Sequence, residues 1–335
     1  MSKIPVIIDV DTGIDDALAL VMACASDKLD IRGITTVSGN VGLEHTTRNT
    51  LNVLDLLGCG NLPVAAGADR PIARKPFKAS LVHGLDGLRG YKFEKNVDYA
   101  LQKEPAWDFM RNILMDSAEK MTLIALGPVT NLAILLEKYP EVKDKIERIV
   151  FMGASYHCGN PGPVQTFNVL VDPEGFREVI RSGIPFYAVP LDTTRKAYIT
   201  DAEKKPIEEM SGPAAKLVKG TLLGYCRGNA VEEKLELGED EEQHNPKRDA
   251  KNAGKSSLHD PATVTFVTNP ELFTVSGPYY CDVECKGELT DGWTLIDMED
   301  WYCKEEEEKN FFFVDSVNRE DFIQLFYDSI RHFSN

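Results

Sequence analysis

The sequence predicts an α/β fold: an open, mostly parallel central sheet flanked by helices. Two observations carry this prediction. Short apolar runs alternate along the chain with longer segments whose apolar residues recur at helical spacing. With 335 residues, of which 43% are hydrophobic, the chain can also bury a large core. Because no Pro/Gly/Ser-rich linker divides the sequence, we expect a single domain over residues 1–335.

The N-terminal segment sets the pattern. An apolar run at residues 5–8 leads into the polar sequence DVDTG at residues 9–13. In the segment that follows, Leu18, Val21 and Met22 are spaced as on one face of a helix. We therefore predict a strand, a tight turn and a helix, in that order.

The same order of elements recurs along the chain. Strands are expected at residues 31–37, 122–126, 149–152 and 185–190, and helices at residues 44–57 and 130–137. Strands that alternate with amphipathic helices favour a mostly parallel sheet covered on both faces. In such folds the ligand binds beyond the carboxyl ends of the strands, where the loops meet.

The charge of the chain restricts its partners. A net charge of -16 argues against binding to a nucleic-acid backbone, which requires clustered Lys and Arg. Acidic runs at residues 232–242, 297–300 and 305–308 hold much of the excess and are typical of solvated surface. No apolar stretch approaches the ~20 residues that cross a bilayer. We expect a small, weakly charged molecule as the ligand, and neither nucleic acid nor membrane.

Cysteine usage indicates a reducing compartment. The chain has seven cysteines, an odd number, and they are widely spread. Its first residues, MSKIPVIIDVD, do not read as a signal peptide. We therefore expect a cytoplasmic protein.

Polar residues follow several of the predicted strands at their carboxyl ends. These residues are Asp9, Asp11, Asp15, Asp16, Ser38, Asn40 and Asp192. Carboxylates and amides gathered on one rim, with hardly a Lys or Arg among them, favour a site for a hard cation and a hydroxyl-rich ligand.

The sequence DVDTGIDD at residues 9–16 is the strongest single signal, because it places four carboxylates in eight positions. Charges so close together repel and raise one another's pKa unless a cation compensates them. The start of the following helix would account for Asp15 and Asp16 through its dipole and free N–H groups. This explanation does not cover Asp9 and Asp11. Ca²⁺, which accepts several oxygen ligands, is the natural candidate for the compensating cation.

Residues 9–16 resemble the N-terminal DxDxxxDD signature of the inosine-uridine-preferring nucleoside hydrolase family. Further segments are similar to motifs of this family and follow in the same order: VSGNV at 37–41, HGLDGL at 83–88, LGPVTN at 126–131, MG at 152–153, GN at 159–160, FN at 167–168, DPE at 172–174, LD at 191–192 and LHDP at 258–261. An ordered set of this length is highly specific. The resemblance implies a Rossmann-like nucleoside hydrolase fold and hydrolysis of the N-glycosidic bond of purine or pyrimidine ribonucleosides.

The resemblance also implies a metal site. Asp11, Asp16, Asp260 and the main-chain carbonyl of Leu126 would bind Ca²⁺, with a water molecule and the ribose 2′- and 3′-hydroxyls completing its shell. Asp11 would act as general base on that water. Asp9 would support the metal ligands from behind.

Contacts to the substrate are implied in the same way. Asp15, Asn40 and Asn168 would bind the ribose hydroxyls. His259, beside Asp260, would act as general acid toward the departing base, and His83 would have a binding or accessory acid role. The oxocarbenium-like transition state of such a reaction would be stabilised by the surrounding carboxylates.

The chain departs from the family pattern at Thr166. The family usually has Glu there, which binds the ribose 5′-hydroxyl together with the amide that matches Asn160. A hydroxyl can still form a hydrogen bond, but a carboxylate acceptor is lost. We expect an altered 5′ pocket, with either weaker catalysis or tolerance of 5′-modified ribosyl compounds.

A hydrophilic stretch at residues 231–255 is a second departure. Its composition is typical of a mobile acidic surface loop, whereas the position before His259 would suit a lid over the base. Tyr225, on the preceding helix, is either a contact to the base or a core residue. Both alternatives stay open at this point.

Two other classes of function are compatible with parts of the sequence. Residues 9–13 approximate the DxDx[TV] motif of haloacid dehalogenase-type phosphatases, but the fifth position is Gly13 and no late acidic motif for Mg²⁺ follows. The other alternative is a nucleoside sensor without activity. A protein that only binds would have no need for a base at Asp11 and an acid at His259. The base preference is open, and the resemblance implies a homodimer or homotetramer.

Overall fold

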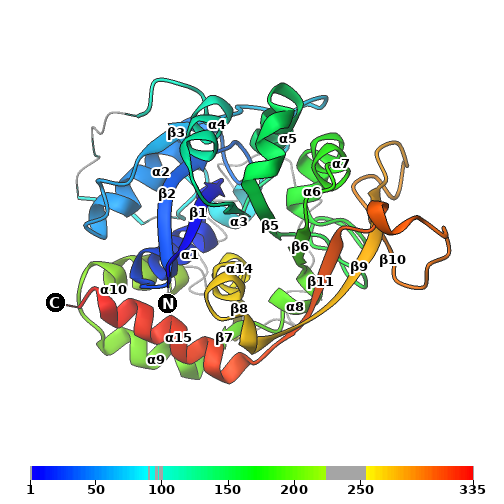
Figure 1. Ribbon diagram of the computed structural model, residues 1–335. Coiled ribbons are helices and arrows are strands. Elements are labelled where there is room, and N and C mark those ends of the chain that lie inside the picture. Colours follow the sequence, from blue (N-terminus) through cyan, green and yellow to red (C-terminus); the bar gives the residue numbers. More distant parts are fainter. Residues whose placement is uncertain (1, 90, 95–96, 98–100, 224–253, 335) are drawn as a thin grey trace.

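The computed structural model describes residues 2–89, 91–94, 97, 101–223 and 254–334 (Figure 1). Its centre is a nine-stranded sheet, with strands in the spatial order β10 (Thr294–Asp297), β9 (Phe273–Val283), β11 (Phe311–Val317), β6 (Phe186–Val189), β5 (Ile146–Met152), β4 (Met121–Ala125), β1 (Ile4–Val10), β2 (Leu29–Thr36) and β3 (Val64–Ala66). From β11 to β3 neighbouring strands are parallel, and β9 runs antiparallel to β11 and β10. The predicted fold class is confirmed.

Helices cover both faces of the sheet (Figure 1). One face carries α1 (Ile14–Ala25), α2 (Leu43–Leu56), α9 (Asp201–Glu209), α10 (Pro213–Val218), α14 (His259–Thr268) and α15 (Arg319–His332). The other carries α4 (Ala106–Asp116), α5 (Thr130–Lys138) and α7 (Pro173–Ile180). Shorter elements are α3 (Ser80–His83), α6 (Phe167–Val171), α8 (Leu191–Thr194), the helical turns Pro140–Lys145, Lys219–Leu223, Pro270–Leu272 and Glu306–Glu308, and a separate two-stranded sheet of β7 (Tyr198–Thr200) and β8 (Lys255–Ser257).

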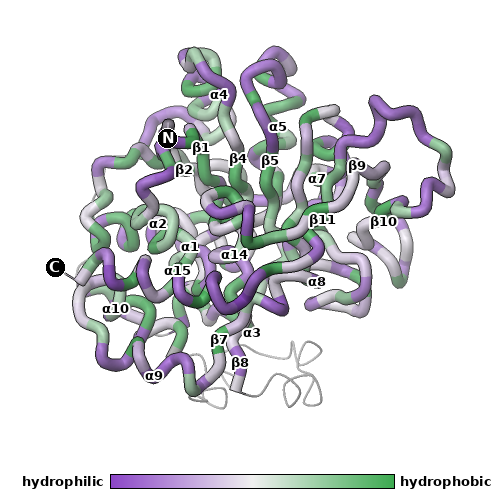
Figure 2. The backbone as a smooth tube through the Cα atoms, turned by 60° about the horizontal axis from the view of Figure 1, so that its bottom comes forward, coloured by the Kyte–Doolittle hydropathy of each residue, from purple (hydrophilic) through white to green (hydrophobic). Residues whose placement is uncertain are grey.

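The central strands are apolar throughout because both of their faces are buried. In β1, Val6 and Ile8 belong to the core on the α1 face, whereas Ile7 belongs to the core on the α5 face. A strand between two layers of helices therefore needs apolar side chains at successive positions. Figure 2 shows this as hydrophobic colouring along β4 and β5, while the loops beyond β10 are largely hydrophilic.

Strand β1 is longer than the predicted strand at residues 5–8, and Asp9 lies inside it instead of in the turn. Its register places Asp9 opposite Thr35 on β2. The Thr35 hydroxyl donates to Asp9 Oδ1 at 2.5 Å, and the Asn131 amide donates to the same oxygen at 2.8 Å. These bonds explain how a strand can continue through a buried acid. The other predicted elements lie where expected, with ends shifted by a few residues.

The C-terminal edge of the sheet was not predicted. Most positions of β9 are exposed or half-buried, without a regular alternation, so its sequence lacks the pattern that identifies a strand. Among the helices of the described residues, none combines the length and the apolar character that crossing a membrane would need.

Candidate active site

The loop after β1 is folded around the Asp16 side chain. Asp16 lies in the first turn of α1 and is completely buried. Its Oδ2 accepts the Gly13 N–H at 3.0 Å, and its Oδ1 accepts the Asp11 N–H at 3.1 Å. The carboxylate thus satisfies the N–H of the N-cap residue Gly13, which the helix leaves free, and the N–H of Asp11 in the loop before it. It also fixes Asp11 relative to the helix.

Asp11 is buried between two loops. Its Oδ2 accepts the Asn40 N–H at 2.7 Å, while its Oδ1 has no hydrogen-bond partner among the described residues. A Cβ atom at Gly39 would lie 2.1 Å from Asp11 Oδ2, and one at Gly127 would lie 2.6 Å from Asp11 Oδ1. The glycines of the VSGNV and LGPVTN motifs therefore let the two loops close on this carboxylate.

Asp15, Asp16 and Asp260 form a compact carboxylate group. Each places an oxygen within 4.8 Å of the others. Asp260 comes from the first turn of α14 and is 2% exposed. Asp15 Oδ1 is buried and has no hydrogen-bond partner in the described part of the chain. Asp11 lies outside this 4.8 Å group, but its charge raises the pKa of Asp260.

Burial raises the pKa values of all four acids of this region. Burial raises the pKa of Asp11 and Asp260 well above their usual range, and neighbouring carboxylates raise them further. Burial also raises the pKa of Asp15 and of Asp16 to about 6. Within the described residues, no Lys or Arg forms an ion pair with any of these four acids. Such a set matches the oxygen ligands of a hard divalent cation.

Asp9 lies behind this group and points to the α5 face. Beyond its bonds from Thr35 and Asn131, its Oδ2 is buried without a described partner, and burial raises its pKa to about 7. Thr35 and Asn131 were not predicted to take part in the site. The signal for Thr35 lies in the register of two strands, which the sequence alone does not specify.

Two amides predicted to bind ribose hold the strand ends together in this structure. The Asn40 side chain donates to the Asp11 carbonyl at 3.2 Å and to Asp16 Oδ2 at 3.1 Å. The Asn168 side chain donates to the Leu126 carbonyl at 2.6 Å and to the Met152 carbonyl at 2.9 Å. The Asn40 amide therefore lies against the carboxylate group, and the Asn168 amide bridges the carboxyl ends of β4 and β5.

The two predicted histidines lie on the same rim. His83 ends α3 and is 7% exposed; its Nδ1 accepts the Ile14 N–H at 3.1 Å and lies 3.9 Å from Asp15 Oδ1. His259 begins α14, and its Nδ1 is 2.7 Å from the Thr194 hydroxyl. Burial lowers the pKa of each imidazole to about 4. The contact with Thr194 was not predicted, because α8 is distant in sequence.

The residues predicted to form the 5′ pocket lie on the loop between β5 and α6. Thr166 is 2% exposed, and its hydroxyl accepts the Ala154 N–H at 3.1 Å. Asn160 Oδ1 accepts the Phe167 N–H at 2.9 Å. Asp192 lies on the same side of the sheet, but its carboxylate accepts the N–H groups of residues 156 and 157. Tyr225 and nearly all of residues 231–255 lie outside the described residues.

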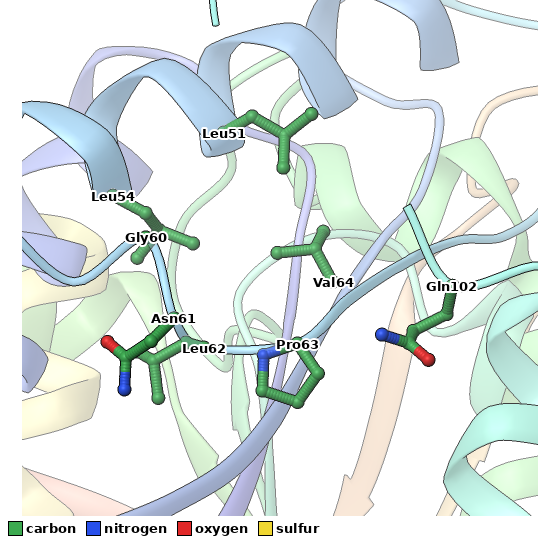
Figure 3. Close-up of a pocket in the computed structure, with 8 residues that line it drawn as sticks. All are labelled: Leu51, Leu54, Gly60, Asn61, Leu62, Pro63, Val64 and Gln102. Carbon is green, nitrogen blue, oxygen red and sulfur yellow. The ribbon is translucent and has the colours of Figure 1, made fainter. Parts of the chain in front are cut away.

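A pocket lies elsewhere, between the end of α2 and β3 (Figure 3). Its lining residues are Leu51, Leu54, Gly60, Asn61, Leu62, Pro63, Val64 and Gln102. None of these side chains is titratable, so this pocket offers no acid, base or nucleophile. The candidate acids and bases are those of the carboxylate group and the two histidines.

Comparisons with known proteins agree with this geometry. The model of the family described as "Inosine-uridine preferring nucleoside hydrolase" matches residues 6–324. The chain is 36% identical to the pyrimidine-specific ribonucleoside hydrolase RihA of Escherichia coli (strain K12) over 99% of each chain. It is 35% identical to RihA of Shigella boydii, again over 99% of each chain.

Solved structures give the same assignment. A purine-preferring ribonucleoside hydrolase from Gardnerella vaginalis has a TM-score of 0.85 and 28% identity, covering 98% of this chain and 99% of its own. A plant nucleoside hydrolase has a TM-score of 0.83 and 26% identity, covering 98% of each chain. The phosphatase and sensor alternatives are not favoured by any of these matches. This chain is therefore an N-glycosyl hydrolase that acts on ribonucleosides, and it belongs to the inosine-uridine preferring nucleoside hydrolase family.

Proposed function

We propose that this enzyme hydrolyses pyrimidine ribonucleosides, and purine ribonucleosides less efficiently, to the free base and ribose. The observation that carries the proposal is the buried carboxylate group at the carboxyl ends of the strands, with oxygens on Asp11 and Asp15 that lack a described protein partner. The preference for pyrimidines is supported by the relatives at 35–36% identity, whose names specify pyrimidine ribonucleosides.

A calcium ion fits the residues present. Asp11, Asp16, Asp260 and the Leu126 carbonyl are proposed to hold it, because they offer the oxygen ligands that Ca²⁺ prefers. When bound, Ca²⁺ lowers the pKa of a water molecule and fixes the ribose 2′- and 3′-hydroxyls in one orientation. Positive charge at this position also offsets the repulsion that raises the pKa of Asp11 and Asp260.

Asp11 is proposed as the general base. It accepts a proton from the attacking water as the water oxygen bonds to C1′. The C1′–N bond breaks, and its electron pair leaves with the base. Asp15, Asn40 and Asn168 are proposed to hold the ribose hydroxyls, and Asp9 is proposed to support the metal ligands from behind. The carboxylates also stabilise the positive charge that develops on the ribose ring.

His259 is proposed to protonate the departing base, with His83 as a second hydrogen-bond donor. Because His83 Nδ1 accepts the Ile14 N–H, the ring proton of a neutral His83 is on Nε2. The lowered pKa values keep both rings neutral at pH 7 before substrate binds. Negative charge that develops on the leaving base raises the pKa of a neighbouring imidazole, so His259 would take a proton from solvent water and pass it to the leaving nitrogen of the base.

Replacing His259 with Ala is expected to lower kcat for uridine by about 10²-fold, the typical contribution of a general acid. p-Nitrophenyl riboside is the matched substrate, because nitrophenolate leaves without being protonated. Its hydrolysis should be nearly unchanged in the same variant. Parallel steady-state assays measure both; an equal loss on the two substrates would show that His259 does not act as an acid.

The 5′ pocket is proposed to be altered by Thr166, which is engaged with the Ala154 N–H. Replacing Thr166 with Glu is expected to raise kcat/KM for uridine about tenfold, the effect of one hydrogen bond to a charged acceptor. 5′-Deoxyuridine lacks the hydroxyl and should show no gain. An unchanged kcat/KM for uridine would contradict the proposal, and retained activity on 5′-modified ribosyl compounds would support tolerance at this position.

The proposed function is tested by incubating the purified protein with uridine, cytidine and inosine and measuring the ribose released as reducing sugar. We expect release from all three, fastest from the pyrimidine nucleosides, and no phosphate from p-nitrophenyl phosphate. Binding of uridine without any turnover would overturn the proposal. The single domain over residues 1–335, the cytoplasmic location and the homodimer or homotetramer stay predictions.

A further inference from the structure

A buried hydroxyl contacts the imidazole of His259. Thr194 ends the short helix α8, which packs beside α14 (Figure 1), and its hydroxyl oxygen lies 2.7 Å from His259 Nδ1. Thr194 is completely buried, and within the described residues its hydroxyl has no other hydrogen-bond partner. The contact therefore fixes one of the two ring nitrogens and leaves the other to be accounted for.

The burial of Thr194 decides which atom donates. The hydroxyl carries one hydrogen and is shielded from water, so the partner of that hydrogen must come from the protein. If the ring donated from Nδ1, the hydroxyl hydrogen would be left without an acceptor, at the full cost of its desolvation. The hydroxyl therefore donates to Nδ1, and the proton of the neutral His259 ring lies on Nε2.

Main-chain hydrogen bonds fix the positions of the two side chains. On the side of the hydroxyl, the Leu191 N–H at the start of α8 donates to the Ala154 carbonyl at 3.2 Å. On the side of the imidazole, the Leu258 N–H donates to the Ala197 carbonyl at 2.8 Å, just beyond the end of α8. Because both anchors lie close to the contact, the hydroxyl and the ring cannot separate without breaking main-chain bonds.

The second ring nitrogen is open to a ligand. His259 Nε2 makes no hydrogen bond with the described part of the chain, and it is not among the buried polar atoms that lack a partner. His259 begins α14 directly before Asp260, which belongs to the carboxylate group. His83 shows a similar arrangement, because the Ile14 N–H occupies its Nδ1. An unpaired Nε2–H beside the proposed ribose site is what a leaving base requires of an acid.

We propose that Thr194 is a positioning residue for the reaction: its hydroxyl holds the His259 ring so that Nε2–H faces the departing base. This inference rests on the proposed function, in which His259 is the acid. A hydroxyl can donate to a neutral imidazole and accept from a charged one, so the contact keeps the ring in one orientation in either state. Because Thr194 is completely buried, it acts on the leaving group only through His259.

The hydrogen bond is measured by ¹⁵N NMR of the full-length protein, labelled at histidine, in the presence of calcium at pH 7.5. His259→Ala identifies the signals of this ring. In wild type we expect a protonated Nε2 and an unprotonated Nδ1 that accepts a hydrogen bond. In Thr194→Val, which nearly keeps the shape but loses the hydroxyl, the Nδ1 signal should move to the position of a free imine nitrogen. Thr194→Ser should keep the wild-type signal.

Two controls accompany this measurement. The His83 signals should not change in any Thr194 variant, because the Ile14 N–H still occupies that Nδ1. Thr193→Val is the matched variant, since Thr193 is equally buried in the same helix but donates to the Val314 carbonyl at 2.6 Å. It should leave the Nδ1 signal in place, and a thermal unfolding curve shows that each variant is folded.

Kinetics distinguishes positioning from a purely structural role. Thr194→Val is expected to lower kcat for uridine about tenfold, less than the loss expected for His259→Ala. Hydrolysis of p-nitrophenyl riboside should be nearly unchanged in the same variant, because nitrophenolate leaves without an acid. Thr194→Ser should stay within a few-fold of wild type on both substrates, and Thr193→Val should affect the two substrates equally.

The proposal is overturned if Nδ1 of His259 is protonated in wild type, if Thr194→Val leaves the Nδ1 signal where it was, or if this variant slows both substrates to the same extent. A wild-type protein that hydrolyses no uridine would instead contradict the proposed function. The NMR signals would still decide in that case whether Thr194 holds the ring.

Discussion

Replacing Asp11 with Asn is expected to lower kcat for uridine by about 10³–10⁴-fold, near the upper range for loss of a general base, because the change also removes a charged ligand from the proposed cation site. Asn has nearly the same shape as Asp, and its amide oxygen can still accept the Asn40 N–H that Asp11 Oδ2 now accepts. The fold should therefore survive. Steady-state kinetics with uridine, alongside a thermal unfolding curve, measure the two effects separately.

Asp297→Asn is the matched control for this variant. Asp297 is also a nearly buried acid at the end of a strand, and it accepts the N–H groups of Trp301 and Tyr302. It lies at the far edge of the sheet, on β10. Its replacement should leave kcat within a few-fold of wild type. If Asp11→Asn retained wild-type kcat, or if both variants lost activity equally, the assignment of Asp11 as the base would be wrong.

Calcium is expected to raise the melting temperature of the chelated protein, and to do so more at pH 7.5 than at pH 5. In the metal-free fold the pKa of Asp9 is about 7 and those of Asp15 and Asp16 are about 6, above the value of about 3.9 for an unfolded Asp. At pH values between the pKa of an unfolded Asp and the raised pKa values of these buried acids, the folded state binds more protons than the unfolded state. Its stability therefore falls as pH rises from about 4 to about 7.

Bound calcium reverses this trend, because it favours the ionised carboxylates. At a free concentration 100 times Kd it contributes about 2.7 kcal/mol, which corresponds to roughly 4 °C in Tm for a chain of this length. Calorimetry of chelated and calcium-loaded protein at pH 5, 6, 7 and 7.5 measures the difference. Magnesium at the same concentration is the control, and a smaller shift is expected from it because it loses its waters reluctantly. A calcium shift that is absent, or that shrinks as pH rises, would contradict the proposed ligands.

The sequence located the elements that carry the site, because local patterns specify them. The polar DVDTGIDD segment after an apolar run placed the acids at the end of β1, and Gly58 marked the end of the predicted helix at residues 44–57. The motifs that the chain shares with its family added Asp260 and His259, which lie far from β1 in sequence. Composition alone would not have connected them.

Contacts that depend on strand register or on packing between distant elements could not be predicted. Thr35 reaches Asp9 only because β1 and β2 are aligned in one register, and Thr194 reaches His259 only because α8 packs beside α14. The same limit applies to Asp192, which was expected on the rim but whose carboxylate caps main-chain N–H groups of a neighbouring loop. A residue pattern indicates that a side chain is polar and near a strand end, but not which groups surround it.

The central claim is that Asp11, Asp16 and Asp260 act through one bound cation. The most direct measurement is the rate of ribose release from uridine by protein that has been exhaustively chelated, before and after calcium is added back. We expect activity to be lost on chelation and restored by about one equivalent of calcium. The Asp260→Asn variant should need far more calcium to recover its activity. Undiminished hydrolysis in the chelated protein, with no metal detected by elemental analysis, would contradict it.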